Sequence, residues 1–171
     1  MIRADAARNR AKILDAAEAV FAEHGITAST EEVARIAGVG IGTVFRHFPT
    51  KESLVEAVFA GIVQGFVDQA RRLCDAEDPG RALFDFLEGM VEVSATKAAY
   101  ADAVAAAEDA LAEGRRELPR ALDTLLTRAQ QAGVVRRDVS MPELLALTAA
   151  VARTGEHAAT SLRIVMDGLK V

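Results

Sequence analysis

The chain has 171 residues, with 20 Lys and Arg against 25 Asp and Glu, so its formal net charge is −5. This length predicts one domain or one domain with a small appendage, and the 51% hydrophobic fraction excludes a disordered chain. A single cysteine excludes an internal disulfide and a Cys-based zinc site. Residues 1–12 lack the apolar segment of a signal peptide, and no apolar run is long enough to span a membrane. We therefore expect a cytoplasmic protein. Its negative net charge, taken alone, argues against a nucleic-acid partner.

The charge is distributed unevenly along the chain. Residues 1–51 hold seven basic and six acidic side chains, whereas residues 52–171 have a balance of −6. Four basic residues lie close together near the N-terminus: Arg3, Arg8, Arg10 and Lys12. Such asymmetry is typical of a small module that contacts a polyanion, although a solvated surface has the same pattern. The cluster predicts either an arm that enters the minor groove of DNA or a disordered tail.

Apolar residues predict four helices in the first half of the chain. They recur at three- and four-residue spacing, which places them on one face of each helix. The expected ranges are 8–23, 30–37, 41–47 and about 51–76. Gly25 and Gly38 are expected to end the first two helices. Ser29 and Glu32 have the spacing of a capping box before the second helix, and Thr50 is expected to cap the fourth.

The second half is also expected to be helical. The turn at residues 78–80 is its clearest break, and Ser140 with Glu143 predicts a second capping box. The expected ranges are about 81–97, 100–112, 117–132, 141–154 and 157–169. No segment alternates with period two over the length of a strand. The fold class is therefore all-α with about nine helices: a tri-helical helix-turn-helix domain, 1–50, joined by the long fourth helix to a C-terminal bundle within 51–171.

The two short helices of the first domain have the spacing of a helix-turn-helix. Its tight turn needs a residue that tolerates a positive φ, and Gly38 provides one. Ala34, four positions earlier, is small enough for a close crossing of the helices, and Val44 is an apolar residue that the second helix can bury. A helical hairpin that only packs has the same spacing, so DNA binding and plain packing both remain open at this point.

The residues of this segment resemble those of a known family. The elements that carry the resemblance are Ile13-Leu14-x-Ala16-Ala17, Phe21-x-x-x-Gly25, Val33-Ala34, Ala37-Gly38-Val39, Gly42-Thr43-Val44-Phe45, His47-Phe48 and Lys51-x-x-Leu54. With these spacings, residues 8–60 resemble the N-terminal domain of the tetracycline-repressor (TetR) family of transcriptional regulators. The tract at 129–145 is similar to one that recurs between the seventh and eighth helices of many members. The remainder resembles the family only in being helical.

The resemblance implies that the helix at 41–47 is a recognition helix, which lies in the major groove of DNA. Gly38 matches the glycine of the turn. The residues that match DNA-contacting positions of the family are Ser29, Ile41, Gly42, Thr43, Phe45, Arg46, His47 and Lys51. Three positions depart from the family pattern. Gly40 replaces a common serine and removes a helix cap, and Ile41 stands where a polar residue is common. Phe45 replaces a tyrosine whose hydroxyl often reaches a phosphate.

Each DNA-contacting residue also has a purely structural interpretation. Arg46 is the one residue of the helix able to make a bidentate contact with guanine, but it can equally be a solvated surface residue. The same holds for Lys51 in the first turn of its helix. His47 can instead pack against Phe48.

A recognition helix of seven residues reads few base pairs, so specific binding requires two copies on half-sites about 34–36 Å apart. The last two helices offer a dimer interface, unless they pack only on their own core; the candidate residues are Leu144, Leu147, Val151, Leu162, Val165 and Leu169. The resemblance also implies a pocket for a small hydrophobic or amphipathic effector. Its candidate wall residues are equally typical of an ordinary core: Phe59, Ile62, Phe66, Phe84, Phe86, Leu87, Met90, Tyr100, Val104 and Leu122.

We therefore expect a repressor that binds a palindromic operator as a homodimer and that an effector releases. The alternative is a helical protein-interaction module without sequence-specific DNA binding. An enzyme is not expected, because the sequence has no Glu-x-x-His pair, P-loop or nucleophile motif, and we predict neither a cofactor nor a metal site. The net charge does not oppose this function, because the excess of acidic residues lies outside residues 1–51.

Overall fold

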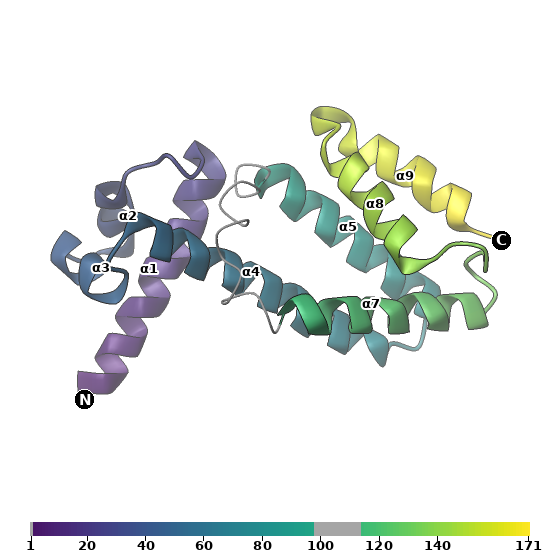
Figure 1. Cartoon of the computed structure of the whole chain (residues 1–171), viewed down its shortest axis with the longest axis horizontal. Helices are drawn as coiled ribbons and strands as arrows, with labels where there is room; N and C mark the ends of the chain where they lie inside the picture. Colours follow the sequence, from purple (N-terminus) through teal and green to yellow (C-terminus); the bar gives the residue numbers. More distant parts are fainter. Residues whose placement is uncertain (1, 98–113) are drawn as a thin grey trace. The chain divides into compact units, whose positions relative to one another are not determined.

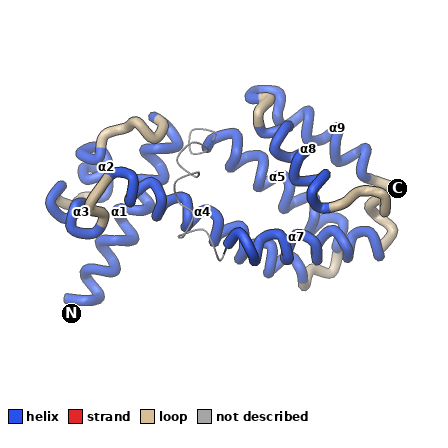
Figure 2. The backbone as a smooth tube through the Cα atoms, in the orientation of Figure 1, coloured by secondary structure: helices blue, strands red, loops and turns tan. Residues whose placement is uncertain are grey.

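The computed structural model describes residues 2–97 and 114–171 (Figure 1). Within these ranges the chain forms eight α-helices and one short 3-10 helix, and Figure 2 draws them with loops and no strand. The all-α prediction is therefore confirmed. The expected helix at 100–112 lies outside the described residues. No helix in the described ranges is both long and apolar enough to cross a membrane.

The chain divides into two compact units, each with its own hydrophobic core. The described residues of the first unit end at Ile62, and those of the second begin at Val63. The division falls inside α4 (Lys51–Cys74), so this helix contributes residues to both units. The domain boundary predicted between residues 50 and 51 lies at the first residue of the same helix.

The first unit contains α1 (Ile2–His24), α2 (Thr30–Ala37), α3 (Ile41–His47) and the first half of α4. All four helices contribute to one core, whose buried residues are Ile13, Ala16, Ala17, Val20, Phe21, Val33, Ala34, Ala37, Val44, Phe48, Leu54, Val55 and Val58. This arrangement explains why two helices as short as α2 and α3 form at all. Helices of this length are marginal in isolation and need the packing of an apolar face.

The N-terminal basic cluster lies on a helix. α1 begins at Ile2 rather than at residue 8, so the prediction of a disordered tail is wrong. The arm in the minor groove stays a prediction. Arg8 donates to Asp5 at 2.8 Å, one helical turn away. The apolar stripe begins only at Ile13, and the described residues before it are exposed or half-buried, so the stripe could not reveal these early turns.

The turn between α2 and α3 depends on Gly38. This residue has a φ of 67° and a ψ of 34°, the left-handed conformation that glycine adopts without steric cost. The N–H of Val39 donates to the carbonyl of Ala34 at 3.0 Å and closes the end of α2. α3 then begins at Ile41, after the N-cap Gly40, which has no side chain to cap the helix. At its other end, the C-cap Phe48 donates its N–H to the carbonyl of Val44 at 2.8 Å.

The start of α2 differs in one detail from the predicted capping box. Ser29 is the N-cap, and its hydroxyl oxygen accepts from the N–H of Glu31 at 3.1 Å. The hydroxyl donates to the carboxylate of Glu31, however, and not to that of Glu32. Glu32 lies 3.7 Å from Arg35 and 3.8 Å from His24. The cap is therefore confirmed, but the predicted partner of the serine is wrong.

The second unit contains the rest of α4 with α5 (Pro79–Lys97), α7 (Gly114–Gln131), α8 (Met141–Ala152), the 3-10 helix Gly155–His157 and α9 (Ala158–Leu169). Its core includes Leu83, Phe86, Leu87, Leu122, Leu125, Leu126, Leu144, Val151, Leu162 and Leu169. The capping box of α8 is present as predicted: the N–H of Ser140 donates to Glu143 at 2.8 Å. At the predicted break, Pro79 is already the first residue of α5, and Asp78 caps it by accepting from Arg81 at 2.9 Å.

The loop between α7 and α8 is fixed by two long side chains. Gln130 donates from its side-chain amide to the carbonyls of Arg136 at 3.0 Å and Val139 at 2.9 Å. Arg136 contacts both carboxylate oxygens of Asp138 at 2.6 Å and lowers the pKa of that carboxyl to about 2. The N–H of Arg136 also donates to the carbonyl of Leu169 at 2.9 Å, which ties the loop to the end of α9.

We predict that alanine at two glycines of the helix-turn-helix changes the free energy of unfolding in opposite directions. Gly38→Ala should lower the free energy of unfolding by about 1–2 kcal/mol, because an L-residue is strained in the left-handed region. Gly42→Ala, inside α3 with nothing within 4 Å of the added Cβ, should raise it by about 0.5–1 kcal/mol. Urea denaturation of both variants measures the two values. A stable Gly38→Ala variant would contradict the role given to the turn.

Candidate nucleic-acid interface

One face of α3 packs on the core and the opposite face is open to solvent. Val44 is the buried residue of the helix, with 1% of its surface exposed. A helix turns by about 100° per residue, so residues two positions away from Val44 point almost directly away from the core, and its neighbours in sequence point sideways. The exposed face consists of Ile41, Gly42, Phe45 and Arg46. Thr43 and His47 flank this face and are half-buried.

The exposed face combines an unpaired cation with two large apolar side chains. Arg46 is exposed and makes no hydrogen bond or ion pair with any described residue. Lys51, half-buried in the first turn of α4, also has no partner among the described residues. Arg35 on α2, by contrast, lies 3.7 Å from Glu32. Ile41 and Phe45 are 37% and 44% exposed, which is unusual for side chains of their size.

The ring of Phe48 connects the end of α3 to α1. The guanidinium of Arg10 lies 5.1 Å from the centre of this ring, which is a cation–π contact. The imidazole of His47 lies 6.4 Å from the same ring at a tilt of 48°, so the structure favours the packing interpretation of His47. The role of Arg10 escaped the sequence analysis, because no local spacing relates two residues so far apart in the chain.

Ser29 lies exposed at the start of α2, but its hydroxyl is already engaged. It accepts from the backbone of Glu31 and donates to the carboxylate of the same residue. This hydrogen bond lowers the pKa of Glu31 below its usual value, because it stabilises the charged carboxylate. A negative charge beside Ser29 opposes the approach of a phosphate to this end of α2.

The predicted effector-pocket residues that the structure describes are divided between the two hydrophobic cores. Phe59 and Ile62 pack against the core of the first unit. In the second unit, three of the predicted residues are fully buried in the core: Phe86, Leu87 and Leu122. Three more are half-buried around that core: Phe66, Phe84 and Met90. Tyr100 and Val104 lie outside the described residues, and none of the others lines a cavity described in the structure.

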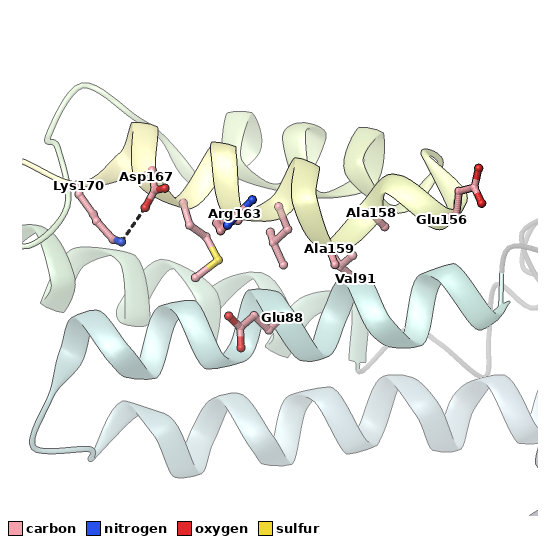
Figure 3. Close-up of a pocket in the computed structure, with 11 residues that line it drawn as sticks. Glu88, Val91, Glu156, Ala158, Ala159, Arg163, Asp167 and Lys170 are labelled. Atoms are coloured by element: carbon pink, nitrogen blue, oxygen red, sulfur yellow. Dashed lines mark hydrogen bonds and ion pairs between the residues drawn. The ribbon is translucent and has the colours of Figure 1, made fainter.

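The largest described cavity lies instead between α5 and α9 and has a volume of about 610 Å³ (Figure 3). Its apolar lining includes Val91 of α5 with Leu162 and Met166 of α9. Charged side chains also line it, among them Glu88 of α5 and Arg163 of α9. None of its lining residues is among the predicted effector-pocket residues. Sequence reasoning did not find this cavity, because charged residues next to a helix stripe resemble an ordinary solvated face.

Most predicted dimer residues belong to the core of their own chain. Leu144, Val151, Leu162 and Leu169 are each at most 5% exposed, so their side chains have almost no surface left for a second chain. Val165 is half-buried and Leu147 is 43% exposed. The sequence analysis missed Ile164 on α9, which is 67% exposed. A regular apolar stripe marks the side of a helix that faces its own core, and an apolar residue off the stripe marks another surface.

In comparisons with known proteins, both parts of the chain match families of transcriptional regulators. Residues 13–58 match a family model described as "Bacterial regulatory proteins, tetR family". Residues 78–171, more than half of the chain, match a model described as "Transcriptional regulator SbtR-like, C-terminal domain". The crystal structure of a TetR transcription regulatory protein from Mycobacterium vanbaalenii is 42% identical, with a TM-score of 0.81 over 100% of both chains.

Two curated relatives show the same similarity over shorter regions. The HTH-type transcriptional regulator UidR of Escherichia coli is 33% identical over 118 residues, which cover 67% of this chain and 56% of that protein. The HTH-type transcriptional repressor KstR2 of Rhodococcus jostii is 32% identical over 79 residues, covering 46% of this chain and 39% of that protein. The match thus spans about half the length of the first of these relatives. All of these proteins are named as regulators or repressors of transcription.

Proposed function

Because the chain belongs to the TetR family of bacterial transcriptional regulators, we propose that it binds a palindromic DNA operator as a homodimer and represses transcription in the cytoplasm. A small effector then releases it from the DNA. The observation that carries the proposal is the exposed face of α3, where Arg46 has no partner among the described residues. Repression is further supported by the similarity to KstR2, which is named a repressor.

Arg46 and Lys51 have different roles in this proposal. Phosphate contacts position a protein on the duplex, and contacts with base edges specify the sequence. Arg46 projects from the middle of the exposed face of α3, so it is the candidate for a bidentate contact with guanine in the major groove. Lys51 begins the next helix and is the candidate for a phosphate contact. Glu31 near Ser29 makes the start of α2 a weaker phosphate site than the sequence suggested.

The dimer surface that we propose is the exposed side of α8 and α9. It contains Leu147 on α8 and Ile164 on α9, with Val165 at its edge. Exposed small residues accompany them, including Ala146 and Ala150. Small side chains allow two helices to approach closely, and a twofold axis brings the same surface of each copy together. The buried leucines of these helices pack beneath this surface and do not contact the second copy.

The effector that we propose is amphipathic. The cavity between α5 and α9 has the volume of a typical small-molecule site. Its apolar lining suits a hydrocarbon part of the ligand, and Arg163 with Glu88 suits a polar part. An effector releases DNA only if it binds the DNA-free conformation more tightly than the DNA-bound one. α4 is the element through which such a difference can pass, because its residues belong to both units.

Selection from a random duplex library followed by two alanine variants tests the DNA-binding proposal. The wild-type chain should select a palindrome. Arg46→Ala should weaken binding by about 1–3 kcal/mol and relax the preference at one base pair of each half-site. Lys51→Ala is the matched control: it should weaken binding to all sequences alike and reduce the slope of affinity against salt by about one. Failure to select any sequence would leave the helical interaction module as the better description.

Sedimentation analysis at micromolar concentration tests the dimer surface. The wild-type chain should sediment at twice its mass of 18.1 kDa. Ile164→Asp should sediment as a monomer, because each copy would bury an unpaired carboxylate in the proposed interface. Ile36→Asp, at a residue of α2 that is 49% exposed, is the matched control and should remain dimeric. A wild-type chain found only at the monomer mass would contradict the proposal.

A further inference from the structure

The exposed face of α3 offers few hydrogen bonds to DNA. Of its four residues, only Arg46 has a side-chain donor; Ile41 and Phe45 are apolar, and Gly42 has no side chain. Thr43 lies at the edge and is half-buried. A helix that reads bases through hydrogen bonds needs several polar side chains on this face. This helix therefore reads most of its half-site by another kind of contact.

Ile41 and Phe45 form one apolar surface. They are four residues apart, so their side chains are neighbours on the same side of the helix. Next to them, a Cβ on Gly42 would meet nothing within 4 Å, so the backbone here is uncovered by any other described part of the chain. A glycine at such a position permits close approach of the helix backbone to a ligand. The apolar pair can thus reach deep into a groove.

Base edges in the major groove present only one apolar group. Every base pair shows hydrogen-bond donors and acceptors there, and T·A pairs add the 5-methyl group of thymine. An apolar side chain over a donor or acceptor removes water from that polar group without replacing its hydrogen bond, which is unfavourable. The same side chain over a methyl group buries apolar surface on both partners.

We infer that Ile41 and Phe45 recognise the 5-methyl groups of thymines in the operator half-site. The inference rests on the proposed DNA-binding function and adds the chemistry by which the sequence is read. Arg46 then selects a guanine beside these thymines, since it projects from the next row of the same face. The half-site combines at least one guanine with T·A pairs at the positions under Ile41 and Phe45.

Deoxyuridine tests this inference, because it pairs like thymidine and lacks only the methyl group. The operator is first obtained by library selection, and each thymine of the half-site is then replaced by uracil. At one or two positions, the loss of the methyl should weaken binding about fourfold per half-site, or about fifteenfold when both half-sites are changed. Because 5-methylcytosine carries the same methyl group, replacing thymine there by 5-methylcytosine should retain more affinity than replacing it by cytosine.

Two variants assign the effect to the side chains. In Ile41→Ala and Phe45→Ala, the ratio of affinities for the thymine and uracil operators should fall toward one at the position that each residue covers. Ile36→Ala is the matched control, because Ile36 is an exposed isoleucine on α2, and its ratio should equal that of the wild type. The ratio is independent of any general loss of binding that a variant causes, so a poorly folded variant does not imitate the result.

The outcomes separate this inference from the function on which it rests. If the chain selects an operator but binds the uracil and thymine forms equally, the inference is wrong and the DNA-binding proposal stands. If the thymine preference persists in both alanine variants, the methyl groups are read by other residues and the inference is again wrong. If no operator is selected, the proposed function fails and the inference fails with it.

Discussion

The helix-turn-helix depends on the burial of one side of a seven-residue helix. A helix as short as α3 is marginal in water, because it has too few hydrogen bonds to offset the cost of nucleation. Val44 and Phe48 anchor it to the core of the first unit, and the left-handed Gly38 sets the direction in which it leaves α2. Arg10 of α1 lies over the outer part of the same anchor, on the ring of Phe48. The exposed face of α3 has a fixed direction only because its other face is held in this way.

Because one side of α3 is held in the core, its exposed face can present a site for a polyanion even though the chain as a whole is acidic. The formal charge is −5 overall, and several cations of the first unit are engaged with nearby carboxylates or rings, as Arg35 and Arg10 are. Arg46 and Lys51 have no partners among the described residues and lie at α3 and at the helix that follows it. A few positive charges thus attract DNA at close range, whereas the rest of the chain is acidic and repels it. Because few cations can contact phosphates, affinity for nonspecific DNA should be low and should fall only gradually as salt rises.

The helices and their ends could be predicted from the sequence, because they depend on residues that are close together in the chain. Apolar stripes located the helices and glycines located their ends, so the bounds of α2 and α3 agree with the structure to the residue. Properties that depend on distant residues were not predictable. The contact between Arg10 and Phe48 joins residues far apart in sequence. The spacing of the capping box also did not show that Ser29 bonds to Glu31 rather than to Glu32. Regular leucines of α8 and α9 were interpreted as a dimer surface, although regularity signals packing against the helix's own core.

The openness of the exposed face of α3 has a consequence for the evolution of such regulators. Ile41, Phe45 and Arg46 have much of their surface in solvent, and a side chain added at Gly42 meets nothing. Surface substitutions away from buried groups usually change stability by less than about 0.5 kcal/mol, so changes on this face should leave the packing of Val44 in the core largely intact. The residues that choose an operator can therefore diverge between duplicated genes without first unfolding the domain. A library randomised at these four positions should yield folded proteins with new operators far more often than one randomised on the buried side.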